Sequence, residues 1–192
     1  MKKIFFILVL VIAGHSVFAQ NDSCFAGVYL TKNDLVNDHL SYKVNLSENG
    51  NKLKFPPVAD WKLEVKIVTP TQTYKFPAGT IYGYSQCGRV YRYSPGGSLY
   101  SIEDFYRIEE VGSLVIYTSV FNSGSEYFYS KDLSSPVRRL NLWNLKGDFP
   151  GQHSFIHHAK KLKRDGVHGG LAMQNSQGKF IINNIYISTI KE

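Results

Sequence analysis

Short runs of alternating hydrophobic and polar residues fill most of the chain between residues 25 and 131. The clearest run is 62–68, in which Leu63, Val65 and Ile67 alternate with charged residues, as in a strand that buries one face. The remaining strands are predicted at 25–30, 41–46, 52–55, 71–76, 80–84, 89–93, 99–108, 113–121 and 126–131. Strands spaced by roughly ten residues are typical of antiparallel meanders, sandwiches and barrels.

Two turn signals predict how neighbouring strands connect. Asn49-Gly50 is a dipeptide typical of tight hairpins, so we expect 41–46 to pair with 52–55. The segment Ser85–Gly88 predicts a second hairpin with Cys87 at its tip.

Helical signals are few and lie mainly after residue 131. Thr31 followed by Asp34 predicts an N-cap and a short helix through residue 39. Ser135-Pro136 and Gly147 predict the start and end of a second helix. Its Trp143 is expected to anchor the helix to the sheet, so that Trp143→Ala would cost about 3 to 5 kcal/mol.

The last third of the chain completes the predicted fold. Between residues 148 and 165, an apolar stripe predicts another helix; its members are Phe155, Ile156, Ala159 and Leu162. The β-branched run 179–190 predicts a buried closing strand. The fold class is therefore α+β, with a mainly antiparallel sheet, two C-terminal helices and a closing C-terminal strand.

Residues 1–19 have the composition of a secretory signal. Two lysines precede an apolar core at 4–13, which is too short to cross a bilayer of about 30 Å as a helix. Ala19 is the small residue that a signal peptidase requires, so we expect cleavage after it and a single exported domain at 20–192, periplasmic or secreted. Lipidation of Cys24 is the alternative, which the polar residues before it disfavour.

Composition narrows the class of protein further. The 192 residues include 2 Trp, 13 Tyr and 12 Phe, and 43% are apolar, which is typical of a globular chain rather than a disordered one. The formal net charge is +7, of which the first two lysines supply two. This modest excess favours anionic partners, but export argues against nucleic acid. No segment after the signal is apolar enough to span a membrane.

The two cysteines, Cys24 and Cys87, are expected to form a disulfide, since isolated thiols in an oxidising compartment usually join. The pair would close a loop worth about 4 kcal/mol in the chain-entropy model. A nucleophilic Cys87 is the alternative, because Cys87-Gly88 is faintly similar to the nucleophile segment of papain-like proteases.

Tyrosine provides the strongest candidate for binding. Three pairs have the i, i+2 spacing that places both rings on one face of a strand: Tyr82/Tyr84, Tyr91/Tyr93 and Tyr127/Tyr129. If their strands are neighbours, the rings form one aromatic surface suited to glycans, peptides or lipid-like ligands, with Arg89 or Arg92 as a charged anchor. The alternative is that these rings are packed in the core.

A second candidate surface is basic. It consists of His153, His157, Lys160, Lys161 and Arg164, which share the polar face of the predicted helix. The i, i+4 histidines have the spacing of a zinc pair, but the surrounding positive charge disfavours a metal, and no cofactor is predicted. The face would suit anionic lipid head groups or acidic glycans, unless it is simply solvated.

Evidence for catalysis is weak. Glu103 and Asp104 point to opposite sides of a strand, as do Glu109 and Glu110, so neither pair converges on one atom. No nucleophile elbow, phosphate loop or dinucleotide motif occurs.

The chain resembles a group of exported proteins of Bacteroidota-type bacteria through Gly27–Thr31 leading to Asp34, and through Tyr82–Tyr84 leading to Gly88–Arg92. The resemblance implies bacterial export and a mostly β fold but supplies no activity. We therefore expect a non-catalytic envelope protein that binds a ligand. The alternatives are a hydrolase of envelope polymers such as glycans or peptides, and a protein that docks an envelope partner through an edge strand.

Overall fold

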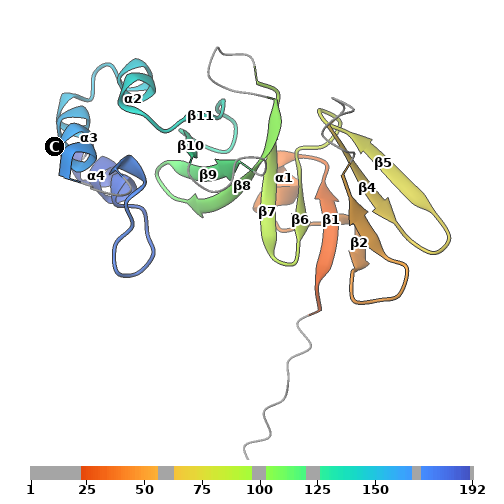
Figure 1. Cartoon of the computed structure of the whole chain (residues 1–192). Coiled ribbons are helices and arrows are strands. Elements are labelled where there is room, and N and C mark those ends of the chain that lie inside the picture. The colour runs from red at the N-terminus through yellow and green to blue at the C-terminus, as the bar shows by residue number, and fades with distance from the viewer. Residues whose placement is uncertain (1–22, 56–62, 97–102, 120–125, 166–169, 191–192) are drawn as a thin grey trace, which may run out of the picture.

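The computed structural model describes residues 23–55, 63–96, 103–119, 126–165 and 170–190. An eight-stranded antiparallel sheet forms most of the fold, in the order β11-β10-β9-β8-β7-β6-β1-β2 (Figure 1). Its strands are β1 (Phe25–Tyr29), β2 (Ser41–Asn45), β6 (Gly83–Gln86), β7 (Arg89–Ser94), β8 (Asp104–Val111), β9 (Val115–Ser119), β10 (Tyr127–Ser130) and β11 (Arg138–Arg139). The α+β class and the antiparallel arrangement predicted from the sequence are confirmed. The predicted signal at 1–19 lies outside the described residues.

A second sheet of three strands comprises β3 (Lys52–Lys54), β4 (Glu64–Val68) and β5 (Thr73–Pro77). The predicted alternation in β4 is confirmed, since Val65 and Ile67 are both fully buried. The predicted hairpin across Asn49-Gly50 is wrong, because β2 pairs with β1 and β3 pairs with β4. Gly50 still turns the chain at φ +90°, but the turn leads from one sheet to the other.

The β6–β7 hairpin has Cys87 at its tip, as predicted. Cys87 and Gly88 both have positive φ, at +50° and +76°, which is the conformation of a two-residue hairpin turn. At the other end of the hairpin, Gly83 lies opposite Arg92. A Cβ at Gly83 would overlap the backbone carbonyl oxygen of Tyr91, so only glycine fits at this position of the strand pair.

Three hydrophobic clusters hold the layers together. The small sheet packs on one part of the large sheet through Val65, Ile67 and Phe76, which meet Tyr84 and Phe105. The C-terminal helices cover the strand pair β9–β10 through a second cluster. A third cluster contains Tyr106, Val115, Tyr117, Phe128 and Val137. Val137 joins it from the segment that precedes β11.

The first helix, α1 (Lys32–Val36), is stabilised by the predicted cap. The Asp34 amide donates to Thr31 Oγ1 at 3.2 Å, and the Thr31 amide donates to Asp34 Oδ2 at 2.8 Å, which is a capping box. Tyr29 Oη donates to Asp38 Oδ1 at 2.8 Å. The capping box fixes the start of α1, and the Tyr29–Asp38 bond ties the residues after α1 to β1.

The second helix, α2 (Leu142–Asp148), begins later than predicted. Asn141 is the cap, because its side chain accepts a 2.8 Å hydrogen bond from the Asn144 amide. The residues that follow Pro136 instead add β11 to the sheet. Gly147 lies inside the helix rather than at its end. Trp143 is 69% exposed and Leu145 is fully buried, so Leu145 and not Trp143 anchors the helix.

The last described segments are helical. Helix α3 (His153–Asp165) has the predicted apolar stripe, with Phe155 and Ala159 fully buried. A short 3-10 turn, η2 (Gly170–Ala172), leads toward α4 (Ile181–Thr189). The predicted closing strand over 179–190 is therefore wrong.

The reason lies in the spacing of the buried residues of α4. Ile182, Asn183 and Thr189 are buried, and Ile185 and Tyr186 pack against the same core. These positions repeat with the helical period of 3.6, not with the period of two of a strand. Tertiary contacts thus override the strand preference of the isoleucines.

Candidate functional site

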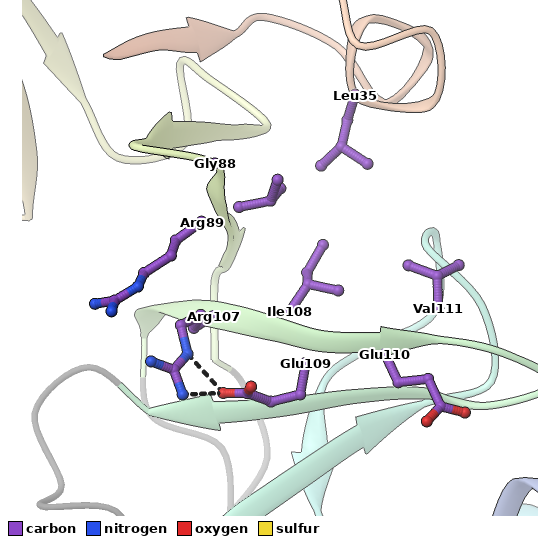
Figure 2. Close-up of a pocket in the computed structure, with 9 residues that line it drawn as sticks. Leu35, Gly88, Arg89, Arg107, Ile108, Glu109, Glu110 and Val111 are labelled. Carbon is purple, nitrogen blue, oxygen red and sulfur yellow. Dashed lines mark hydrogen bonds and ion pairs between the residues drawn. The ribbon is translucent and has the colours of Figure 1, made fainter. Parts of the chain in front are cut away.

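A pocket of about 500 Å³ opens between α1 and the strands β7 and β8 (Figure 2). It lies where β8 extends past the β6–β7 turn. Its described lining consists of Leu35, Gly88, Arg89, Val90, Arg107, Ile108, Glu109, Glu110 and Val111. The volume lies within the range of sites for small ligands, which is roughly 300–1,000 Å³.

The lining combines four aliphatic side chains with four charged ones. Ile108 and Val111 point from β8 toward Leu35 of α1 (Figure 2), and Leu35, Val90 and Ile108 are each half-buried. Val111 is 61% exposed, as is Val36 at the end of α1. Exposed apolar side chains beside a pocket provide surface that a ligand can cover.

An irregularity in β8 decides where its charged residues point. The register shifts between Ile108 and Glu110, so that Ile108 pairs with Tyr117 and Glu110 with Ile116. Because Glu109 is the extra residue, Glu110 turns to the face of the sheet that the C-terminal helices cover. Val111 then returns to the face of Ile108, so both side chains point toward Leu35.

The carboxylate of Glu109 is held by its neighbours. Arg107 donates to Glu109 Oε1 through Nε at 2.6 Å and Nη2 at 2.5 Å, and Thr118 Oγ1 donates to the same oxygen at 2.5 Å. Figure 2 shows this pair on the side of β8 away from Leu35. Arg107 and Thr118 therefore hold the Glu109 carboxylate in place at the edge of the pocket.

The carboxylate of Glu110 is engaged with α4. Its Oε2 accepts from the Phe180 amide at 2.9 Å, and its Oε1 accepts from Asn183 Nδ2 at 2.7 Å. Asn183 Oδ1 in turn accepts from the Leu114 amide at 2.7 Å. Phe180 is the N-cap of α4 and has no side-chain cap of its own, so Glu110 supplies a carboxylate at the helix N-terminus. Its role is structural.

Arg92, a predicted ligand anchor, is only 5% exposed. It donates to Tyr117 Oη at 2.7 Å, to Ser130 Oγ at 3.2 Å and to the Ser135 carbonyl oxygen at 2.8 Å. Its guanidinium also lies 5.6 Å from the ring of Tyr82. Arg92 thus ties the segment before β11 to the sheet and cannot reach a ligand at the surface.

The predicted tyrosine residues do not form one open surface. Tyr84, Tyr91 and Tyr129 are 2%, 9% and 0% exposed. Tyr84 and Tyr91 stack with centroids 4.4 Å apart beneath the small sheet, and burial raises the pKa of the Tyr84 hydroxyl. Tyr129 packs under the C-terminal helices, and its hydroxyl donates to Asp148 Oδ2 at 2.7 Å.

The remaining tyrosines of the predicted pairs, Tyr82, Tyr93 and Tyr127, are half-buried. Tyr82 precedes β6, so the strand alternation does not apply to it, and its hydroxyl donates to the Leu133 carbonyl oxygen. Burial raises the pKa of Tyr82 to about 12. Tyr93 Oη donates to Glu103 Oε1 at 2.8 Å. Tyr127 packs edge-on against Phe180, with centroids 5.5 Å apart.

The predicted basic patch lies on the outer face of α3. All five of its members, His153, His157, Lys160, Lys161 and Arg164, are exposed. Within the described ranges, no group of three or more His, Cys, Asp or Glu is arranged to hold a metal.

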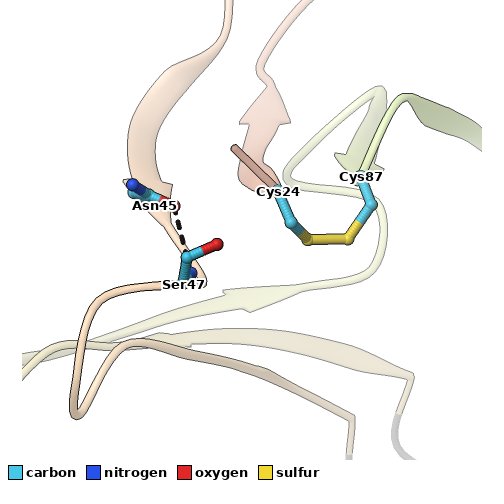
Figure 3. The surroundings of a disulfide bond; sticks show 4 residues. All are labelled: Cys24, Asn45, Ser47 and Cys87. Carbon is cyan, nitrogen blue, oxygen red and sulfur yellow. Dashed lines mark hydrogen bonds between the residues drawn. A yellow bond between two sulfur atoms is a disulfide. The ribbon is translucent and has the colours of Figure 1, made fainter. Parts of the chain in front are cut away.

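The Cys24–Cys87 disulfide predicted from the sequence is present, with a Cα–Cα distance of 4.4 Å (Figure 3). It joins the residue before β1 to the tip of the β6–β7 hairpin. The Cys87 amide also donates to the Phe25 carbonyl oxygen at 2.8 Å. A nucleophilic thiol at Cys87 is therefore excluded in this oxidised form.

Sequence reasoning missed the pocket because its walls come from segments far apart in the chain. The cap at Thr31 and Asp34 predicted α1 but not that Leu35 lines a pocket together with β8. Comparison with known proteins finds no matching family model, curated protein or solved structure. No helix among the described residues is long and apolar enough to cross a membrane.

Proposed function

We propose that this protein is a non-catalytic ligand-binding protein of the bacterial envelope, and that the pocket between α1 and β7–β8 holds an aliphatic group of its ligand. The observation that carries the proposal is the chemistry of the pocket. Leu35, Val90, Ile108 and Val111 supply aliphatic surface, while the neighbouring carboxylates are already engaged with other groups of the protein.

Burial of aliphatic surface supplies the driving force. Covering a fully exposed valine side chain contributes about 1.5 kcal/mol, so Val111, which is 61% exposed, can contribute about 1 kcal/mol. Arg89 is exposed and belongs to the lining of the pocket, where its charge would favour an acidic group on the ligand. A molecule with an aliphatic chain and one anionic group therefore suits the site.

The same chemistry favours binding over hydrolysis. Among the described residues that line the pocket, none carries a hydroxyl, thiol or imidazole. Glu109 is bound by Arg107 and Thr118, and Glu110 by Asn183 and the Phe180 amide. A general base must be able to reach a substrate proton, and both carboxylates are oriented toward protein partners instead.

Export is the second part of the proposal. The Cys24–Cys87 disulfide supports an oxidising compartment such as the periplasm, and the signal predicted at 1–19 supplies the route. The resemblance to exported proteins of Bacteroidota-type bacteria supports the same location.

Two matched variants test the pocket. Val111 and Val36 are both 61% exposed, but only Val111 lines the pocket. With decanoate as the probe, we expect Val111→Glu to weaken binding measured by calorimetry at least tenfold, because a negative charge would occupy the aliphatic space and repel the carboxylate; this corresponds to about 1.4 kcal/mol. Val36→Glu should bind as the wild type does. Equal loss in both variants, or no binding of decanoate by the wild type, would contradict the proposal.

A further inference from the structure

The outer edge of β8 has no strand partner beside the pocket. Pairing with β7 ends at Tyr91 and Arg107, whereas β8 continues to Val111. On the opposite edge, pairing with β9 continues as far as Val111 and Val115. Within the described parts of the chain, β8 beyond Arg107 is therefore paired on one edge only, and an unpaired strand edge is a template for another chain.

The free backbone groups of this edge include those of Val111. The Gly112 amide donates to the Leu114 carbonyl oxygen at 3.2 Å, so Gly112 directs its backbone groups toward β9. Successive residues of an antiparallel strand direct these groups to opposite edges. The N–H and C=O of Val111 therefore point to the edge that β7 leaves free, where they can form two hydrogen bonds with one residue of an added strand.

The side chain of that added residue would enter the aliphatic part of the pocket. Residues that pair across two antiparallel strands project their side chains from the same face of the sheet. Val111 points toward Leu35 (Figure 2), and Ile108 lines the same space. A residue paired with Val111 must therefore be aliphatic to match its surroundings.

The β6–β7 turn closes one end of this space. Gly88 and Arg89 belong to the lining, so a strand laid along the free edge of β8 meets the turn and cannot continue past it. The occupant must therefore be the end of a chain. A strand antiparallel to β8 runs from Val111 toward Arg107, which brings its C-terminus to the turn.

The charge at the closed end agrees with this direction. Arg89 is exposed and has no hydrogen-bond or ion-pair partner in the described part of the chain, whereas Arg107 is engaged by Glu109. A C-terminal carboxylate would be attracted to Arg89. A parallel strand would bring an N-terminal ammonium group there, and the like charge would repel it.

We propose that the ligand of this pocket is the C-terminal end of a peptide, which adds to β8 as a short antiparallel strand. Its backbone pairs with Val111, an aliphatic side chain near its end fills the pocket, and its carboxylate lies within reach of Arg89. This inference rests on the proposed function and names the class of ligand. A fatty acid has the aliphatic chain and the carboxylate, but it has no amide groups to pair with β8.

The first test uses the peptide acetyl-Thr-Ser-Thr-Leu-Val with a free carboxylate, in which either of the last two residues can face the pocket. Two versions each carry one N-methyl group, on the amide of the leucine or on that of the valine. Amides of an extended strand alternate in direction, so only one methyl group blocks pairing with β8. Calorimetry on the whole protein should show a loss of about tenfold for one version and less than about threefold for the other.

The second test concerns the carboxylate. We expect Arg89→Gln to weaken binding of the free acid about fivefold, whereas Lys54→Gln, which removes an exposed charge of the small sheet, should weaken it less than about twofold. The C-terminal amide of the same peptide should bind wild type and Arg89→Gln equally. Val111→Glu should lose binding of the peptide, and Val36→Glu should retain it.

Decanoate separates this inference from the proposed function. If the wild type binds decanoate but not the peptide, the pocket remains an aliphatic site and the peptide inference is wrong. Equal losses for the two N-methylated versions would show that no strand is added to β8. Equal affinity of the wild type for the acid and the amide, or full binding of the peptide by Val111→Glu, would overturn the inference as well.

Discussion

Asp104 offers the sharpest test of the packing. It is 4% exposed, accepts from the Phe105 amide at 2.7 Å through Oδ1, and accepts from Ser119 Oγ at 2.9 Å through Oδ2. Burial raises the pKa of this carboxyl from 3.8 to about 6, and the two hydrogen bonds only partly oppose the shift. The folded protein therefore holds a charge at neutral pH that its surroundings disfavour.

The contribution of Asp104 to folding stability depends on pH, because its pKa differs between the folded and unfolded states. Because the folded pKa lies above the unfolded pKa, Asp104 stabilises the fold fully below about pH 4, and this contribution is lost as pH rises through about 6. A shift of about two units corresponds to about 3 kcal/mol at most. Asparagine keeps an acceptor for Phe105 and can donate to Ser119 Oγ, so we expect Asp104→Asn to stabilise the protein by about 2 kcal/mol near pH 7.5.

Urea unfolding of wild type and variant at several pH values between about 4 and 8 measures this difference. It should be close to zero at about pH 4, grow through about pH 6 and then stay constant. Glu103→Gln is the control, since Glu103 is the exposed neighbour and should change stability by less than about 0.5 kcal/mol. A difference between Asp104→Asn and wild type that does not vary with pH would refute the reasoning.

Two further pairs of variants test the packing of α2 and the close approach of β6 to β7 at Gly83. Leu145→Ala should destabilise by about 2 to 5 kcal/mol, because Leu145 is fully buried, whereas Trp143→Ala should cost less than about 1 kcal/mol; the reverse order in denaturant unfolding would contradict the observed packing of α2. Gly83→Ala should lose more than about 3 kcal/mol, because the added Cβ meets the Tyr91 carbonyl oxygen. Gly147→Ala, with no atom within 4 Å of the added Cβ, should stabilise by up to about 1 kcal/mol, and a tolerated Gly83→Ala would show that the strands lie farther apart.

Local patterns in the sequence determined most of the elements. The alternation in β4, the cap that begins α1, the hairpin with Cys87 at its tip and the stripe of Phe155 and Ala159 in α3 are properties of a few neighbouring residues. Steric preferences and hydrogen bonds within one or two turns fix such features, and they can therefore be read without knowledge of the fold. The Cys24–Cys87 pairing also followed from the sequence, because no other pair exists.

Tertiary structure alone decided the partners of these elements and the site. The isoleucines of α4 favour a strand locally, but the core buries Ile182 and Thr189 at helical spacing, and Glu110 caps the helix from β8. The paired tyrosines were visible in the sequence, yet only the small sheet and the helices determine that Tyr84 and Tyr129 are buried. The pocket exists because Leu35 of α1 and the residues of β8 come together from distant segments, and one extra residue in β8 directs the Glu110 carboxylate to α4. Contacts between distant segments carry no local signature, so the sequence determined what each segment prefers, and the packing of layers determined which surfaces remain free to bind.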